Sequence, residues 1–230
     1  MVVVFWNVQR IGNPNPKDEE ASARFGLFWS YFEEMAAKAD LIILCEVSQK
    51  GPELALYIKQ KLGFHSTYVA VADANGGASP CAFLVAAKAK APTVLPVGTA
   101  SKRPTIKVTG VGRTVYACHI IAIQGPPAVD EIMDFVTEID DGAVILGDMN
   151  FPQQKWTLKQ YSNEKQYLGD LDLKIVPPLA PFTHQSQSSG KKGSLDYAFA
   201  PKGTVCTATA AVAKYDDFDT IDHAPIAYNI

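Results

Sequence analysis

The sequence predicts a single α/β domain over residues 1–230, in which two β-sheets pack together and helices lie outside them. Three observations support this prediction. Short apolar runs of strand length recur along the chain, helix-bearing connections lie between strands twice, and Gly, Pro and Asn divide the remaining runs. A chain of 230 residues suits one such domain, and 47% hydrophobic with 20% charged residues is ordinary for a globular protein.

The first half of the chain predicts two strands, each followed by a helix. In the first helix, Phe25, Phe28, Phe32 and Met35 recur at helical spacing, so these side chains are expected in the core. Gly63 is placed to stop the second helix, because glycine accepts the left-handed backbone of a C-cap. The predicted strands are residues 2–8 and 41–47, and the predicted helices are residues 22–38 and 51–63.

The second half of the chain is rich in predicted strands. Apolar and β-branched runs alternate there with turn-forming residues, and a predicted helix over residues 128–138 leads into the run AVILGDMN. No repeat of fixed period is present. The predicted strands are residues 66–72, 81–87, 105–110, 114–123, 143–150, 193–201, 207–213 and 223–230.

Charge, hydropathy and cysteine content exclude some classes of protein. A net charge of −3 means that a nucleic-acid partner would need a local basic patch. The longest apolar runs have strand length, which predicts no membrane span, and the opening residues MVVVFWNVQR have no signal-peptide pattern. Cys45, Cys81, Cys118 and Cys206 lack the CxxC spacing of zinc sites, so neither zinc nor a disulfide is expected from them.

Polar residues end several predicted strands, where a hydrophobic core does not explain them. Strand ends are places where a rigid scaffold presents chemistry. In AVILGDMN, strand alternation points Asp148 and Asn150 to the same side of the sheet, with Met149 opposite. The complete set is Asn7, Gln9, Glu46, His119, Asp148, Asn150, Asp196, Asp222 and His223, and of these Gln9 is assigned no role.

Each of these residues also has a purely structural explanation. Glu46 could be a surface or capping carboxylate, His119 a hydrogen-bonded core histidine, and Asp196 and Asp222 turn-capping residues. A buried carboxylate must nevertheless be paired, hydrogen-bonded or metal-bound, so the set argues for one shared ion. Oxygen ligands without cysteine or clustered histidine suit Mg²⁺, or Mn²⁺ or Ca²⁺, and Mg²⁺ commonly binds substrate phosphate as well. The set therefore predicts a phosphate substrate, with the histidines holding or moving protons.

The same segments, taken in order, resemble a known superfamily. FWNVQ, LIILCEV, KRPTIKV, ACHIIA, LGDMN, SLDYAF and DHAPI are similar to the endonuclease/exonuclease/phosphatase superfamily, which includes DNase I. The resemblance spans nearly the whole chain and implies a four-layer α/β/β/α sandwich of two mixed sheets that hydrolyses phosphoesters with a metal. The WNVQ opening, the pair Arg103 and Pro104, and the Gly/Ser-rich loop before SLDYA look most similar to the catalytic subunit of cytolethal distending toxins.

The resemblance implies ligands for the metal and for the phosphate. Glu46 would be the principal metal ligand, with Asn7 and Asp222 lining the same ion. Asn150 would bind a phosphate oxygen. Arg103 would clamp the phosphate, because a planar guanidinium offers several donors where lysine offers a point charge.

The resemblance also implies how protons move. His119 and His223 would flank the scissile phosphate, and Asp196 would hold the imidazole of His223 and raise its basicity. A water would attack phosphorus in line, while the metal and His119 stabilise the leaving oxygen. Asp148 is the competing candidate for positioning or deprotonating that water, and the sequence does not choose between it and His223.

The substrate is less narrowly predicted than the reaction. By resemblance the chain is a Mg²⁺-dependent endonuclease that nicks DNA; a phosphoinositide phosphatase on the same site and a catalytically inactive binding module are the alternatives. Residues 183–194 form a polar basic loop, in which Lys191 and Lys192 would engage a neighbouring phosphate, or which is simply a mobile surface loop. Lysine-to-alanine changes that left the salt dependence of DNA binding unaltered would discard the first of these interpretations.

Partners and compartment are expectations from the resemblance alone. A monomeric catalytic domain is expected, with toxin delivery subunits as its partners if the resemblance extends so far. The chain would then be a secreted toxin or effector, and otherwise a cytoplasmic protein, since no signal peptide is visible in it.

Overall fold

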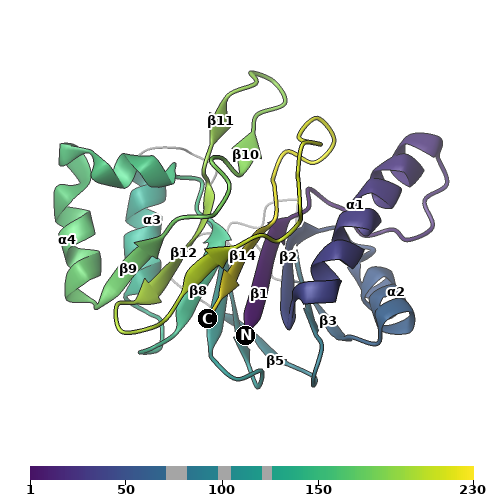
Figure 1. Ribbon diagram of the computed structural model, residues 1–230, viewed down its shortest axis with the longest axis horizontal. Helices are drawn as coiled ribbons and strands as arrows, with labels where there is room; N and C mark the ends of the chain where they lie inside the picture. The colour runs from purple at the N-terminus through teal and green to yellow at the C-terminus, as the bar shows by residue number, and fades with distance from the viewer. Residues whose placement is uncertain (71–81, 98–104, 121–125) are drawn as a thin grey trace.

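A computed structural model of the chain describes residues 1–70, 82–97, 105–120 and 126–230. Two six-stranded sheets pack face to face, and helices lie on the outer side of each sheet (Figure 1). The N- and C-termini lie side by side, since the amino group of Met1 donates to the carbonyl of Ile230 over 3.0 Å. The predicted sandwich of two mixed sheets with outer helices is confirmed.

The first sheet is built around the parallel pair β1 and β2. Its strand order is β13-β14-β1-β2-β4-β3, and all of its other neighbouring pairs are antiparallel. Both faces of β1 and β2 are covered, which explains their nearly continuous apolar sequences. The strands are β1 (Val2–Asn7), β2 (Leu41–Val47), β3 (His65–Ala70), β4 (Ala82–Ala87), β13 (Thr207–Thr209) and β14 (Ile226–Asn229).

The second sheet repeats this plan around the parallel pair β7 and β8. Its order is β5-β6-β7-β8-β12-β9, with antiparallel pairing elsewhere. A separate two-stranded hairpin, β10 (His184–Gln185) and β11 (Lys192–Gly193), projects beyond the sandwich (Figure 1). The strands of the sheet are β5 (Thr93–Val97), β6 (Thr105–Thr109), β7 (Val115–His119), β8 (Val144–Asp148), β9 (Leu173–Val176) and β12 (Asp196–Pro201).

Helices form the two outer layers. The side chain of Asp18 accepts a hydrogen bond from the amide of Ala21, which starts the first helix earlier than predicted, and Gly63 ends the second helix in the left-handed conformation as predicted. Over the first sheet lie α1 (Glu19–Lys38) and α2 (Gly51–Leu62), and over the second lie α3 (Pro126–Val136), α4 (Ser162–Asp170) and the short 3₁₀ turns η1 (Gln153–Thr157) and η2 (Lys159–Tyr161).

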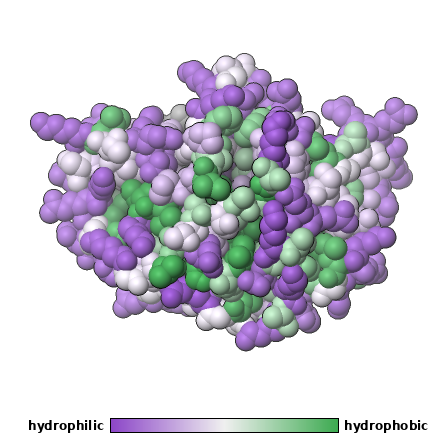
Figure 2. Space-filling model, in the orientation of Figure 1, coloured by the Kyte–Doolittle hydropathy of each residue, from purple (hydrophilic) through white to green (hydrophobic). Residues whose placement is uncertain are grey.

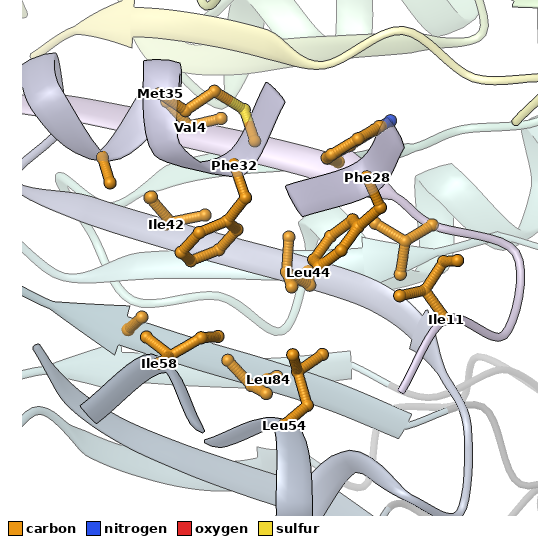
Figure 3. Close-up of a cluster of buried hydrophobic side chains, with 14 of the residues drawn as sticks. Val4, Ile11, Phe28, Phe32, Met35, Ile42, Leu44, Leu54, Ile58 and Leu84 are labelled. Carbon is orange, nitrogen blue, oxygen red and sulfur yellow. The ribbon is translucent and has the colours of Figure 1, made fainter. Parts of the chain in front are cut away.

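Three apolar clusters hold the layers together. The cluster between the sheets joins side chains such as Phe5 and Ile43 to Ile106 and Leu146 of the opposite sheet. A second cluster joins α1 and α2 to the first sheet, and the third joins the remaining helices to the second sheet. Figure 3 shows the helix-facing cluster, with labelled side chains Phe28, Phe32, Met35, Leu54 and Ile58 over Ile42, Leu44 and Leu84.

Several short or polar elements were not predicted from the sequence, because each lacks a strong pattern. The helix α4 has the polar sequence SNEKQYLGD with Leu168 as its buried residue, so it carries no apolar stripe. The strand β5 lies at a sheet edge, contains Pro96 and is largely exposed. The strand β9 and the hairpin strands are only four and two residues long.

Some predicted strands are shorter in the structure. The strand predicted for residues 207–213 ends at Thr209, and the last strand begins at Ile226 rather than at residue 223. In the second sheet, β7 ends at His119. The later start of β14 leaves His223 outside the ladder of the first sheet, where it forms an isolated bridge with His184.

Within the described ranges, no helix combines the length and apolarity needed to cross a bilayer. Cys45, Cys118 and Cys206 are buried free thiols, and Cys81 lies outside the described residues. Figure 2 shows apolar side chains at several places across this face, with hydrophilic side chains between and around them.

Candidate active site

The predicted polar residues meet at one end of the sandwich. Parallel neighbours end at the same sheet edge, so β1 and β2 bring Asn7 and Glu46 together, and β7 and β8 bring His119 beside Asp148. The antiparallel strand β12 starts opposite the end of β8, which pairs Asp196 with Asp148. One group of side chains therefore draws on both sheets.

Asn7 connects the two sheets at this site. Its Nδ2 donates to Glu46 Oε1 and to Asp148 Oδ2, each over 3.1 Å, and its Oδ1 accepts the backbone N–H of Gln9. Asn7 and Asp148 are each 1% exposed, whereas the side chain of Glu46 is 28% exposed. The amide thus holds two negative side chains close together, one at the surface and one inside.

His119 lies between the same two carboxylates. Its Nε2 is 3.3 Å from Glu46 Oε1 and 3.7 Å from Asp148 Oδ2, and its side chain is buried. A protonated imidazole in this position would partly neutralise the two carboxylates.

His223 is held by a buried carboxylate on its far side. Its Nδ1 is 2.8 Å from Asp196 Oδ2, and its Nε2 is 3.6 Å from Asp148 Oδ2. Burial lowers the pKa of His223, but the negative charges of Asp196 and Asp148 outweigh this effect and raise the pKa to about 10. Burial raises the pKa of Asp196, and His223 opposes that rise.

Backbone contacts fix this histidine–carboxylate pair. The hydroxyl of Thr183, which is fully buried, accepts the N–H groups of Leu195 and Asp196 over 3.0 and 2.9 Å. The indole N–H of Trp6 donates to the carbonyl of His223 over 2.7 Å. Both members of the pair are therefore anchored through their main chain as well as to each other.

Unusual backbone conformations concentrate at this end of the molecule. Five non-glycine residues in the described ranges have positive φ, and four of them, Gln9 (45°), Arg10 (68°), Glu46 (55°) and Asn150 (46°), belong to the site or adjoin it. Each such residue costs about 1–3 kcal/mol and is typical of functional sites. At Glu46 the reason is visible: the pairing of β2 with β4 shifts register between Leu44 and Val47, and the bulge turns the carboxylate into the site.

Asp148 and Asn150 are neighbours, but strand alternation is not the reason. The strand β8 ends at Asp148, and the chain then turns so that the N–H of Asn150 donates to Asp148 Oδ1 over 3.0 Å. The Asn150 carboxamide donates to the carbonyl of Ile120 over 2.8 Å. Gly147 is needed in β8 itself, because a Cβ there would lie 2.4 Å from the carbonyl oxygen of Cys118 on β7.

The other predicted residues lie at different distances from this centre. Asp222 adjoins it, with Oδ1 3.7 Å from His223 Nε2 and its N–H donating to Gln9 Oε1. Lys191 and Lys192 are exposed near the projecting hairpin, where Lys192 Nζ lies 4.3 Å from the ring centre of Phe182. Arg103 lies outside the described residues.

Sequence reasoning missed three residues that shape the site. Gln9, which had no expected role, links the backbone of Asp222 to the side chain of Asn7. Thr183 and His184 open the segment that the sequence suggested was a polar loop, and His184 Nε2 lies 3.7 Å from Asp222 Oδ2. A histidine directly after a buried threonine was the available signal, but the lysines and serines that follow obscured it.

Several features of the site fit a bound cation. Among the described residues, the ligand atoms of two sets converge within 4.8 Å, namely Asp148, Asp196 and His223, and His184, Asp222 and His223. The buried Oδ1 atoms of Asp196 and Asp222 have no hydrogen-bond partner within the described ranges. Buried carboxylate oxygens without donors favour a positive ion nearby, and hard oxygen donors such as those of Asp222 and Glu46 suit Mg²⁺.

A pocket opens beside Glu46. Its volume is about 690 Å³, and Arg10 and Arg24 line it together with the acidic residues Glu20 and Asp219. Arg24 Nη2 donates to the carbonyl of Gln9 over 2.7 Å, so its guanidinium is anchored next to the bend that follows β1. The pocket therefore combines two arginines with three carboxylates, those of Glu20, Glu46 and Asp219.

Comparisons with known proteins give matches in structure only. No family model matches the chain, and no curated protein is significantly similar to it in sequence. An AP endonuclease from Archaeoglobus fulgidus is similar in structure, with a TM-score of 0.62 and 14% identity over 100% of this chain and 98% of that chain. The cytolethal distending toxin from Actinobacillus actinomycetemcomitans matches with a TM-score of 0.61 and 16% identity over 99% and 97% of the two chains.

A third similar structure is a phosphatase. The 3′ phosphatase NExo from Neisseria, bound to a product DNA hairpin, matches with a TM-score of 0.60 and 16% identity over 100% of this chain and 98% of that chain. Identities this low establish shared architecture and not shared substrate. The chain has the DNase I-like fold of the endonuclease/exonuclease/phosphatase superfamily.

Proposed function

We propose that the protein is a Mg²⁺-dependent phosphodiesterase that nicks DNA. The observation that carries the proposal is the convergence of two histidines, three carboxylates and two carboxamides at one end of the sandwich. A buried group of this composition is costly to assemble, because each charge loses hydration. A divalent cation can pair with the carboxylates of this group, and a phosphate can accept hydrogen bonds from its imidazoles and carboxamides.

The metal would be held at the surface side of this group. Glu46 is the principal ligand in this proposal, with Asn7 and Asp222 beside it, and the unpartnered Oδ1 of Asp222 is consistent with that role. When bound, Mg²⁺ would neutralise charge on a phosphate oxygen and make a bound water easier to deprotonate. The bulge at Glu46 then has a purpose, since an unkinked strand would aim this carboxylate elsewhere.

The two histidines would act on the scissile phosphate from either side. Asp196 occupies Nδ1 of His223, so Nε2 faces the substrate position, and Nε2 of His119 faces the same region. Asn150 and Arg103 would add donors to phosphate oxygens. Either Asp148 or His223 would orient and deprotonate the attacking water, and Asp148 Oδ2 is placed for this because it faces both imidazoles.

DNA is the substrate that the surroundings favour. Arg10 and Arg24 line the pocket next to Glu46 and could each contact a phosphate beyond the reacting one, but the carboxylates of Glu20 and Asp219 line this pocket too. The similar structures include an AP endonuclease and a phosphatase bound to a DNA hairpin. A role as a secreted toxin domain rests only on the similarity to cytolethal distending toxin. A phosphoinositide phosphatase is the second candidate, since the same residues could act on a phosphomonoester.

Conversion of supercoiled plasmid to nicked and linear forms tests the proposal. We expect nicking with Mg²⁺, none with EDTA, and a loss of about 10²–10⁴-fold in His119→Ala and in His223→Ala. His65→Ala is the matched control, because His65 is exposed on β3 and belongs to the opposite edge of the sheet.

The same preparation separates the two candidate functions. Release of inorganic phosphate from a short-chain phosphoinositide, without nicking, would replace the nuclease by the phosphatase and keep the site. A folded wild-type protein inactive in both assays would contradict the proposal.

A further inference from the structure

A third histidine stands next to the proposed active site. His184 begins the β10–β11 hairpin and forms an isolated antiparallel bridge with His223. The N–H of Gln185 donates to the carbonyl of Asp222 over 2.9 Å, and that of Ala224 donates to the carbonyl of Thr183 over 2.7 Å. Two segments far apart in sequence are thereby fixed side by side.

Three ligand atoms converge where these segments meet. His184 Nε2 is 3.7 Å from Asp222 Oδ2, and His223 Nε2 is 3.7 Å from Asp222 Oδ1. The two imidazole rings lie 4.7 Å apart between centres, and the three ligand atoms lie within 4.8 Å of one another. Ligands about 2.0–2.1 Å from a tetrahedral ion stand about 3.4 Å apart, so small side-chain shifts would bring all three atoms onto one ion.

Two further observations point to an ion here. Asp222 Oδ1 is buried and has no hydrogen-bond partner among the described residues. His223 is already held at Nδ1 by Asp196 over 2.8 Å, and a carboxylate on the second ring nitrogen is the usual support of a metal-binding histidine. Nε2 is then the ring nitrogen that faces Asp222, and a bound ion would take the place of its proton.

We propose that His184, Asp222 and His223 form a site for a transition-metal ion of the Zn²⁺ class. Two imidazole nitrogens and one carboxylate suit Zn²⁺, Co²⁺ or Ni²⁺ and are poor ligands for Mg²⁺, which prefers oxygen. The side chain of His184 is 17% exposed, so an ion could enter from solvent and keep a water as its fourth ligand. Cys45, Cys118 and Cys206, the cysteines within the described ranges, are not among these ligands.

An ion bound at this site would inhibit the Mg²⁺-dependent reaction. This step rests on the proposed function, in which Asp222 binds Mg²⁺ and His223 faces the phosphate. A Zn²⁺ ion bound by both residues removes them from that reaction, so binding at His184 inhibits phosphodiester hydrolysis.

Cobalt absorption tests the site without reference to catalysis. After removal of metals with EDTA and exchange into buffer, the protein is titrated with CoCl₂. We expect the visible bands of four-coordinate Co²⁺, their loss on addition of Zn²⁺, and at least tenfold weaker Co²⁺ binding in His184→Asn. His65→Asn removes an exposed histidine from β3 and should bind Co²⁺ like the wild type.

Two results would overturn the proposal: no four-coordinate spectrum in the wild type, or equal Co²⁺ binding in the wild type and His184→Asn. Thermal unfolding establishes that His184→Asn is folded, and His184→Gln repeats the test with a longer side chain.

An activity measurement distinguishes this inference from the proposed function. The ratio of nicking rates with and without Zn²⁺, at constant Mg²⁺, should fall in the wild type and stay closer to one in His184→Asn. A protein that shows the Co²⁺ bands but nicks no DNA would contradict the nuclease and support the ion site. A protein that nicks DNA but lacks the Co²⁺ bands would support the nuclease and contradict the ion site.

Discussion

The buried end of the sandwich and the projecting hairpin hold their charged side chains in opposite ways. Asp148 and Asp196 are each 1% exposed, and hydrogen bonds with Asn7 and His223 fix their positions. Lys191 and Lys192 are exposed near the hairpin, where water and salt screen them. A buried charge must have hydrogen-bond or ion-pair partners, and these partners fix its position. An exposed charge is solvated by water and contributes mainly to the electrostatic potential at the surface.

If burial sets the size of an effect, the largest change should come from the centre of the site. Asp148→Asn keeps the shape of the side chain but removes the charge that faces both histidines. We expect plasmid nicking to slow by about 10²–10⁴-fold, because Asp148 would position or deprotonate the attacking water. Asp130→Asn on the exposed side of α3 is the control, and an Asp148→Asn rate within tenfold of it would contradict the assignment.

The next largest effect should be on stability. Asp196→Asn leaves His223 without the carboxylate that compensates its buried charge, so the free energy of unfolding should fall by about 3 kcal/mol. Urea denaturation of the metal-free proteins measures the change. A loss below about 1 kcal/mol, which is usual for exposed ion pairs, would mean that burial does not strengthen this pair.

The stability difference between the wild type and Asp196→Asn should also depend on pH. The pKa of His223 is raised from 6.5 to about 10 on folding, so protonation stabilises the folded state. That stabilisation is complete below the unfolded pKa and is lost as the pH rises through the folded pKa. In EDTA, the stability difference between wild type and Asp196→Asn should therefore narrow from about pH 7 to about pH 10. A stability difference that does not change with pH would mean that it does not arise from protonation of His223.

A smaller effect is expected at the partly exposed edge of the site. Glu46→Gln replaces the predicted principal ligand by a neutral one, so the Mg²⁺ concentration for half-maximal nicking should rise by at least about tenfold. Glu20→Gln, which lines the same pocket without joining the site, is the matched control. Unchanged Mg²⁺ dependence in Glu46→Gln would place the ion on other carboxylates.

The smallest effect is expected at the hairpin. Replacing Lys191 and Lys192 by Ala should weaken DNA binding a few-fold and reduce the slope of log K against log salt by up to about 1.8, or about 0.9 for each phosphate that is no longer neutralised. Fluorescence anisotropy at several salt concentrations measures the slope. A slope equal to that of the wild type would show that the hairpin does not touch DNA.

Much of the fold was readable because its strands are buried on both faces. The runs VVVFWN and LIILCEV and the spacing of Phe25, Phe28, Phe32 and Met35 predicted β1, β2 and α1. The helix α4 and the edge strand β5 were missed, since partly exposed elements have no such pattern. The site residues at the strand ends were also predicted, because carboxylates and histidines directly after apolar runs are easily recognised in the sequence.

The layered architecture and the residue types of the site could be predicted from the sequence alone. Apolar runs of strand length, and charged residues at their ends, are recognisable in short stretches of sequence. Only the tertiary structure decided which of those residues meet. It joined Asn7 to Asp148 and His184 to Asp222 and His223, and a bulge turned Glu46 toward the site. The physical reason is that strand register and backbone turns set these distances, and they depend on the packing of segments far apart in the chain.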